Sequence, residues 1–137
     1  MNAFTTKTMQ ILERSLDASS LRHKVLANNI ANVDTPNFKR SDVSFDSALQ
    51  AYLNESPAAL PGMVTHPRHI PIGIQSLSQI QPEIVVEEST IVNNNGNNVD
   101  IDSEMTQLAV NQIKYNALIQ QLNGHFAKLR SAIQGGR

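Results

Sequence analysis

The stretch that decides the fold is DSEMTQLAVNQIKYNALIQQLNGHFAKLRSAI, residues 102–133. From Met105, alternating steps of three and four residues meet an apolar side chain at every position except Gln112. These positions are Met105, Leu108, Gln112, Tyr115, Ile119, Leu122, Phe126, Leu129 and Ile133. The spacing keeps them on one helix face and gives the repeat of about 3.5 residues typical of coiled coils. The stretch predicts a helix of roughly 48 Å that needs a partner helix, because its apolar stripe is narrow.

The flanks of this stretch also favour a helix, with acidic residues at its start and basic residues at its end. They are Asp100, Asp102 and Glu104 at the start and Lys128 and Arg130 at the end. Gly135 and Gly136 then end the helix. Gly124 lies within it, and because the apolar seam stays in phase across Gly124 we expect close packing against another helix there.

The predicted partner helix covers residues 5–33, with Thr5 or Thr6 as its cap. The same stepping gives one apolar seam along it, weakened by two polar residues in the middle. Its members are Met9, Leu12, Leu16, Ser19, His23, Leu26, Ile30 and Val33. A second stripe lies off that seam, formed by Ile11, Ala18, Leu21 and Val25. At roughly 43 Å the helix nearly matches the C-terminal one in length.

The middle of the chain is predicted to be extended and loop-rich. Residues 34–37 end the first helix at a proline, and residues 44–53 suit a short amphipathic helix. Five of the six prolines fall within 55–98, where residues 84–86 and 90–92 are expected to pair as a small β-hairpin. The expected organisation is therefore 1–54 and 100–137 as one helical domain, with 55–99 as an irregular excursion.

The sequence thus predicts a mainly all-α fold, an antiparallel coiled-coil pair of long N- and C-terminal helices. The side chains expected to pair the helices are Leu12, Leu16, Leu26, Ile30, Met105, Leu108, Ile119, Leu122, Phe126 and Leu129. One helix pair buries only a seam, so we expect the second stripe to stay exposed and the chain to be fully ordered only in an assembly. Circular dichroism of the dilute protein would test this expectation.

Composition excludes several classes of function. The net charge of −1 and the isoelectric point near 6.4 give no electrostatic case for binding nucleic acid. The chain has no cysteine, which rules out disulfides and thiol chemistry. No apolar run has the length of a membrane span, and the N-terminus lacks the apolar stretch of a secretory signal. We expect no membrane insertion, and any export would use a route that needs no such signal.

Residue clusters that could carry chemistry have simpler explanations. His66 and His69 have the spacing of a metal pair, but they lie in a proline loop with no third ligand nearby in the sequence. Asp100 and Asp102 lack the glycine and glutamate of a calcium loop and suit a helix cap better. No nucleophile elbow or phosphate loop is present. We therefore expect no enzyme activity, no cofactor, no metal and no small-molecule substrate.

The unusual feature is LANNIANVDTPNFKR, residues 26–40, which places three asparagines at a helix end. Asparagine is a mediocre helix former, but its amide both donates and accepts hydrogen bonds. From the residues alone, two readings stay open: an ordinary helix end followed by a turn, or a buried contact made by the amides.

This stretch resembles a known family. Residues 27–32, followed by Thr35-Pro36 and Phe38-Lys39, are similar to the N-terminal signature of bacterial flagellar rod and hook proteins. Residues 97–105 resemble the segment that opens the C-terminal helix in proximal rod members of that family, and residues 66–70 resemble a stretch typical of one such member. Asn37 departs from the glycine usual there, which affects only the turn because asparagine tolerates left-handed geometry.

The resemblance implies a structural subunit of the proximal rod, assembled through its terminal helices to transmit torque. The implied partners are other rod proteins, the adaptor and MS-ring proteins of the basal body, and the flagellar type III export apparatus. The implied location is the periplasmic rod, reached without signal cleavage. The residues implied to shape the turn and the subunit contacts are Asn28, Asn29, Ile30, Asn32, Thr35, Pro36 and Phe38, with His66, Pro67, Arg68 and His69 as a middle-loop contact. The alternatives are another axial rod subunit and a soluble helical export adaptor or chaperone.

Overall fold

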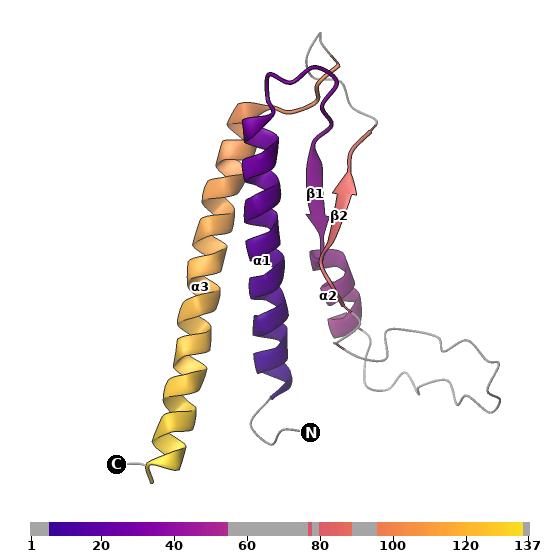
Figure 1. The fold of residues 1–137 in the computed structure, drawn as a ribbon. Coiled ribbons are helices and arrows are strands. Elements are labelled where there is room, and N and C mark those ends of the chain that lie inside the picture. The colour runs from indigo at the N-terminus through magenta and orange to yellow at the C-terminus, as the bar shows by residue number, and fades with distance from the viewer. Residues whose placement is uncertain (1–5, 55–76, 78–79, 89–95, 136–137) are drawn as a thin grey trace, which may run out of the picture.

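The computed structural model describes residues 6–54, 77, 80–88 and 96–135. Its elements are α1 (Lys7–Ala31), β1 (Ser41–Ser44), α2 (Asp46–Asn54), β2 (Glu83–Val86) and α3 (Ile101–Ile133), as Figure 1 shows. Four parts of the sequence predictions lie outside the described residues: the cap at Thr5, the helix end at Gly136, the strand at 90–92, and the loop contact at His66, Pro67, Arg68 and His69.

The two long helices lie side by side and antiparallel, which confirms the predicted architecture (Figure 1). Thr6 caps α1, because its hydroxyl accepts a hydrogen bond of 3.3 Å from the Met9 amide. Asp100 caps α3 by accepting from the amides of Asp102 and Ser103. With 33 residues against 25, α3 is the longer helix. Since no proline interrupts either helix, the backbone hydrogen bonds of each helix continue from its first cap to its last.

A small sheet and a short helix form a layer on the other side of α1 (Figure 1). The predicted short helix is confirmed as α2, which begins two residues later than expected. Residues 84–86 do form a strand, but β2 pairs antiparallel with β1, with Ser41 opposite Val86. The sequence pattern predicts no strand at 41–44, and the structure alone shows this partner of β2. Strand pairing depends on segments that lie far apart in the chain, and local pattern does not reveal it.

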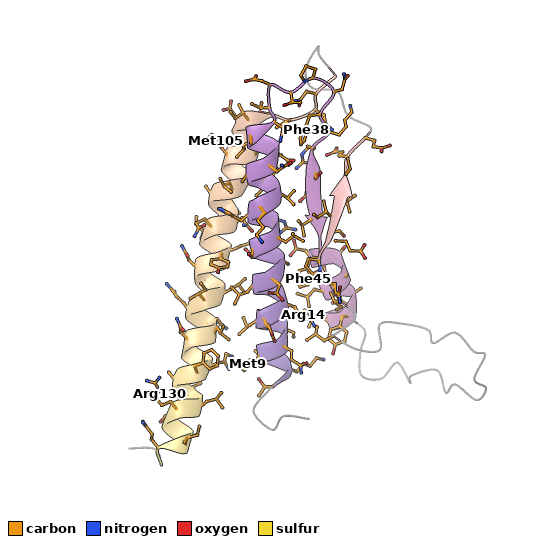
Figure 2. The ribbon with its side chains drawn as sticks, in the orientation of Figure 1. Met9, Arg14, Phe38, Phe45, Met105 and Arg130 are labelled. Carbon is orange, nitrogen blue, oxygen red and sulfur yellow. The ribbon has the colours of Figure 1, made fainter. Side chains whose placement is uncertain are left out.

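The second apolar stripe of α1 is covered by the chain itself, so the expectation that it stays exposed was wrong. Ala18 and Val25 of α1 form a buried cluster with side chains from the segment between the two long helices. Those side chains are Val43, Phe45, Leu77 and Ile80, with Ile11, Leu21, Ala48, Leu49 and Tyr52 around them. Figure 2 shows Phe45 beside α1, where β1 leads into α2. The stripe therefore gives no reason of its own for the chain to need an assembly.

Arg22 fastens this layer to α1. Its guanidinium donates a 2.7 Å hydrogen bond to the Val43 carbonyl and lies 3.0 Å from a carboxylate oxygen of Asp46. Closer to the helix start, the Lys7 ammonium lies 4.7 Å from the ring centre of Tyr52 in α2, a cation–π contact. The segment from β1 to α2 is thus attached to α1 at two levels, beside a small apolar core.

The predicted seam of α3 consists of two sets of positions, each spaced by seven residues. Only one of the two sets faces α1 as predicted. Leu108, Tyr115, Leu122 and Leu129 are partly buried, as the seam predicted. Met105 and Phe126 belong to the other set and are 56% and 48% exposed. Glu104 and Asn111, which the seam did not include, are almost fully buried. The helix is therefore rotated so that the residue before Met105, and not Met105 itself, faces α1.

Candidate assembly interface

A buried carboxylate joins the start of α3 to the end of α1. Glu104 is 1% exposed, and its Oε2 accepts a 2.8 Å hydrogen bond from Nδ2 of Asn29, which is fully buried. The same Asn29 amide exchanges two hydrogen bonds with the backbone of Ser41, donating at 2.8 Å and accepting at 3.0 Å. A buried carboxylate is stable only when it is paired and hydrogen-bonded, so these contacts fix the position of α3 along α1.

Arg40 supplies the positive charge for this carboxylate. Its Nε lies 3.0 Å from Oε1 of Glu104, and one terminal nitrogen lies 2.7 Å from Oε2 of Glu87. Burial by itself lowers the pKa of Arg40, but the hydrogen bonds to Glu87 and Glu104 and the nearby Asp42 carboxylate together raise that pKa above its ordinary value. The guanidinium therefore stays charged and holds both glutamates.

Asn98 connects the same arginine to the end of β2. Its Oδ1 accepts a 2.6 Å hydrogen bond from the Arg40 amide, and its Nδ2 donates at 2.7 Å to the Glu87 carbonyl. The Glu87 amide in turn donates at 2.9 Å to the Arg40 carbonyl, which continues the pairing of β1 and β2. The approach to α3 is thereby tied to the small sheet as well as to α1.

Asn97 organises the turn that follows α1. Its buried Nδ2 lies 2.9 Å from the carbonyl oxygens of Asn32, Val33 and Thr35, and its Oδ1 accepts at 2.7 Å from the Val99 amide. One NH2 group, with two N–H donors, is thus shared among three carbonyls at the end of α1 and in the turn that follows it. This arrangement holds the predicted turn motif against the entry to α3.

Two left-handed residues meet at this turn. Asn37 has a φ of 59°, and Gly96 has a φ of 81°. A Cβ on Gly96 would lie 2.6 Å from Oδ1 of Asn37, so only glycine fits beside that side chain. The sequence analysis expected Asn37 to tolerate left-handed geometry, and the structure confirms that it adopts it.

A second polar link lies lower on the helix pair. The Ser19 hydroxyl donates to Oδ1 of Asn111 at 2.9 Å, and Nδ2 of Asn111 donates to the Ser19 carbonyl at 2.9 Å. Both residues are buried and 92 positions apart. The weak point that the sequence analysis found in the seam at Ser19 is therefore the site of a reciprocal hydrogen-bonded pair.

The predicted motif residues have separate positions in the structure. Asn29 is buried in the cluster, and Ile30, Asn32 and Phe38 are partly buried. Asn28, Thr35 and Pro36 are exposed, so their side chains lie on the outer surface of the turn. Of the predicted helix-pairing residues, Leu12 and Leu26 are buried. Leu16, Ile30, Leu108, Ile119, Leu122 and Leu129 are partly buried. The roles predicted for both sets stay predictions.

Sequence reasoning missed the residues that make the buried polar links. Glu104 was assigned only to the helix dipole, residues 97 and 98 only to a turn or to the family resemblance, and Asn111 and Arg40 to no role. A signal existed for Asn111, because it lies between Leu108 and Tyr115 on one face of a helix whose partner seam is polar at Ser19. The pairing of Arg40 with Glu104 has no local signal, since 64 positions separate them.

This arrangement consists of contacts between the helices, the small sheet and the turn. In the described part of the chain, every buried side-chain nitrogen or oxygen has a hydrogen-bond partner. The same residues contain no group of three or more metal-binding side chains, and none of the described helices could cross a membrane. The network therefore holds together four segments of the chain, with no free polar group directed at a ligand.

Comparison with known proteins assigns the chain to a family. A family profile described as "Flagella basal body rod protein" matches residues 9–39, which cover most of α1 and the turn after it. The chain is 42% identical over 130 residues to the flagellar basal body rod protein FlgB of Bacillus subtilis (strain 168), covering 95% of each chain. It is 43% identical over 131 residues to FlgB of Borreliella burgdorferi (strain ATCC 35210 / DSM 4680 / CIP 102532 / B31), covering 93% of this chain and 95% of that one. FlgB of Escherichia coli (strain K12) is 29% identical over 131 residues, covering 93% of this chain and 94% of its own. With its two long helices, its asparagine-rich turn and relatives that match it over nearly their whole length, this chain belongs to the FlgB family of flagellar basal body rod proteins.

Proposed function

We propose that this chain, a structural subunit of the flagellar basal body rod, lies in the proximal part of the rod and transmits torque through its helices. The observation that carries the proposal is the similarity to FlgB proteins along nearly the whole chain. The antiparallel helix pair supports it, because long helices that extend along one axis can pass a load from end to end. We infer no catalytic role.

The two buried polar links suit a subunit under shear. Asn29 with Glu104 and Ser19 with Asn111 join α1 to α3 at two levels, and sliding one helix along the other would break both links. Leaving a buried polar group without its hydrogen-bond partner costs roughly 1–3 kcal/mol, and more for a charged group such as the Glu104 carboxylate. Apolar contacts resist sliding less specifically. After one helix shifts along the other, a second leucine can take the place of the first at nearly the same contact. The polar links therefore keep the helices in one register while the seam around them supplies most of the burial.

Several side chains remain for contacts with neighbouring subunits. Met105 and Phe126 are exposed on α3, and Asn28, Thr35 and Pro36 are exposed at the turn. We propose that these residues meet other subunits, whereas Leu12, Leu16, Leu26 and Ile30 of α1 pair with α3 inside the chain. For α3 the inside positions would be Leu108, Ile119, Leu122 and Leu129.

The finer location and partners belong to the same proposal. The neighbours would be other rod proteins together with the adaptor and MS-ring proteins of the basal body. The subunit would reach the periplasm through the flagellar type III export apparatus without cleavage of a signal peptide. The family supports assembly within the basal body, and these specific partners follow from the resemblance seen in the sequence.

Complementation in a strain that lacks its own copy of this protein tests the proposal. We expect the wild-type chain to restore swimming and to be recovered in purified basal bodies, where imaging would place it at the base of the rod. Mass spectrometry of the recovered chain should find its first residues intact. Flagellated, motile cells without the chain, or a chain recovered only from the cytoplasm, would refute a role in the rod.

A further inference from the structure

The small sheet has one edge that the described part of the chain leaves open. Figure 1 shows β1 between α1 and β2, which makes β2 the outer strand. All four residues of β2 are exposed, and Ile84, Val85 and Val86 are 54%, 51% and 51% exposed. Folded proteins usually protect such a strand with lysine, proline or a covering segment, because its free backbone groups can pair with another extended chain.

The register of the two strands shows which backbone groups point toward that edge. Ser41 lies opposite Val86. The next pair along the ladder joins Arg40 to Glu87, whose amide donates to the Arg40 carbonyl. In an antiparallel ladder only alternate pairs exchange hydrogen bonds, so the pair that contains Val86 does not. The amide and carbonyl groups of Ile84 and Val86 therefore point away from β1, toward the open edge.

The opposite edge of the sheet is satisfied by side chains of α1. Asn29 donates at 2.8 Å to the Ser41 carbonyl and accepts at 3.0 Å from the Ser41 amide. Arg22 donates at 2.7 Å to the Val43 carbonyl. Within residues 6–54, 77, 80–88 and 96–135, no side chain serves the outer edge of β2 in this way. The sheet thus has one satisfied edge and one open edge.

Acidic residues surround the open edge. Glu83 begins β2, and Glu87 and Glu88 follow the strand directly. Glu83 and Glu88 are exposed, and Glu87 is held by Arg40 at 2.7 Å. No lysine or arginine occurs in residues 69–113. An incoming strand would therefore meet apolar side chains in the middle of β2 and negative charge at both of its ends.

The same charges disfavour a second copy of β2 as the occupant. Two copies joined antiparallel at this edge, with Ile84 opposite Val86, would place Glu83 of each copy opposite Glu87 of the other. Like charges directly opposite each other destabilise a strand pair. The edge fits a different chain, one with β-branched residues flanked by lysine or arginine.

We infer that the outer edge of β2 is a docking site for an extended, basic segment of another protein, which joins the sheet as a third strand. The backbone of Ile84 and Val86 bonds to the segment, and the cations of the segment lie beside Glu83 and Glu88. In strand addition of this kind, backbone hydrogen bonds supply affinity and the side chains supply specificity. The inference goes beyond the proposed function, because it names a partner that is not another copy of the chain.

Peptide binding to the purified full-length chain tests the site. The probe is a fluorescently labelled peptide, Lys-Val-Thr-Val-Thr-Lys, and the matched control peptide has glutamate in place of both lysines. We expect the basic peptide to bind and the acidic peptide not to bind, as measured by fluorescence anisotropy. Added salt should weaken the binding, because the ion pairs at the edge are exposed to solvent.

Hydrogen exchange measured by nuclear magnetic resonance locates the bound peptide. In the free chain the amides of Ile84 and Val86 should exchange quickly, whereas the amide of Val85, which points toward β1, should exchange more slowly. The basic peptide should slow the exchange at Ile84 and Val86 and leave Val85 unchanged. This readout separates a third strand from a peptide that only lies on the acidic surface.

Two variants alter the edge in different ways. Val86→Pro removes an outward amide hydrogen and no bond to β1, and it should weaken peptide binding about tenfold through the lost hydrogen bond and the bulk of the ring. Glu83→Lys combined with Glu88→Lys leaves the backbone unchanged and should reverse the preference, so that the acidic peptide binds. Ile101→Pro is the control, because proline is tolerated at the first position of a helix, and it should bind the basic peptide like the wild type.

In a strain that lacks its own copy of this protein, the two edge variants should swim poorly although circular dichroism finds them folded. Full swimming by both would overturn the inference, and so would equal binding of the two peptides or unchanged exchange at Ile84 and Val86. A pure chain that dimerises and becomes monomeric with Val86→Pro would identify a second copy as the occupant, against the inference. Failure of the wild-type chain to restore swimming would refute the proposed function instead, and the peptide results would still stand.

Discussion

Glu104 and Asn29 lie 75 positions apart in the chain, yet their side chains share a 2.8 Å hydrogen bond in the interior of the protein. This contact brings the first turn of α3 to the last turns of α1 and, through Arg40, to the small sheet. The helix pair and the excursion are therefore coupled through one buried carboxylate. A change at this position should affect both.

Glu104→Ala should lower the free energy of unfolding by about 3 kcal/mol, because it leaves the Asn29 amide and the Arg40 guanidinium without their shared acceptor. Urea unfolding followed by circular dichroism would measure the loss. Glu88→Ala, at an exposed glutamate, should change the value by less than about 0.5 kcal/mol. Equal effects of the two substitutions would show that the buried pair contributes nothing specific.

Asn97→Asp should destabilise the protein by about 2 kcal/mol or more, although the two side chains have nearly the same shape. The substitution replaces an amide that donates to the carbonyls of Asn32, Val33 and Thr35 with a carboxylate that can only accept. Thermal unfolding would measure the change, with Asn123→Asp at an exposed helix position as the control. A melting temperature as high as that of the wild type would argue against this role for Asn97.

A comparison of Gly96→Ala with Gly135→Ala separates the cost of a steric contact from the cost of a positive φ. Both glycines have positive φ, at 81° and 78°, so alanine costs about 1 kcal/mol at either position. Only at Gly96 would the added Cβ also meet the Asn37 side chain, at 2.6 Å. Gly96→Ala should therefore be the more destabilising change, and Asn37→Gly in the same chain should recover part of the difference. Identical unfolding curves for the two alanine variants would contradict the crowding.

The contribution of Arg40 to stability should not change between neutral pH and about pH 10. Burial lowers its pKa, but the hydrogen bonds to Glu87 and Glu104 outweigh burial and raise the pKa above its already strongly alkaline ordinary value. A group whose pKa is raised on folding stabilises fully below its unfolded pKa and loses that effect only as pH rises through the folded value. The difference in unfolding free energy between wild type and Arg40→Met should thus be constant over that range. A difference that shrinks steadily with rising pH would contradict this expectation.

Leu122→Asp should abolish rod assembly and swimming. Leu122 is partly buried on the face that α3 turns toward α1, and an aspartate there places an unpaired charge in the seam. Complementation on soft agar would measure motility, and circular dichroism of the purified variant would show whether the helices still pair. Normal swimming with this substitution would mean that the seam is not needed for assembly.

The sequence by itself determined the two long helices, the cap at Asp100 and the two stripes of α1, and it narrowed the first cap to Thr5 or Thr6, of which the structure has Thr6. These features follow from local spacing and end residues, so each can be recognised from a few neighbouring positions. The left-handed turn at Asn37 is of the same local kind.

Only the tertiary structure decided which strands pair and which side chains of the helices face one another. It paired β2 with β1 and covered the Ala18 and Val25 stripe with the segment between the long helices. It also rotated α3 so that Glu104 and Asn111 point inward while Met105 points outward. Each of these outcomes depends on partners dozens of residues away. A polar side chain can be buried in the seam only where its partner lies opposite, and the position of that partner is set by the folded chain and not by local pattern.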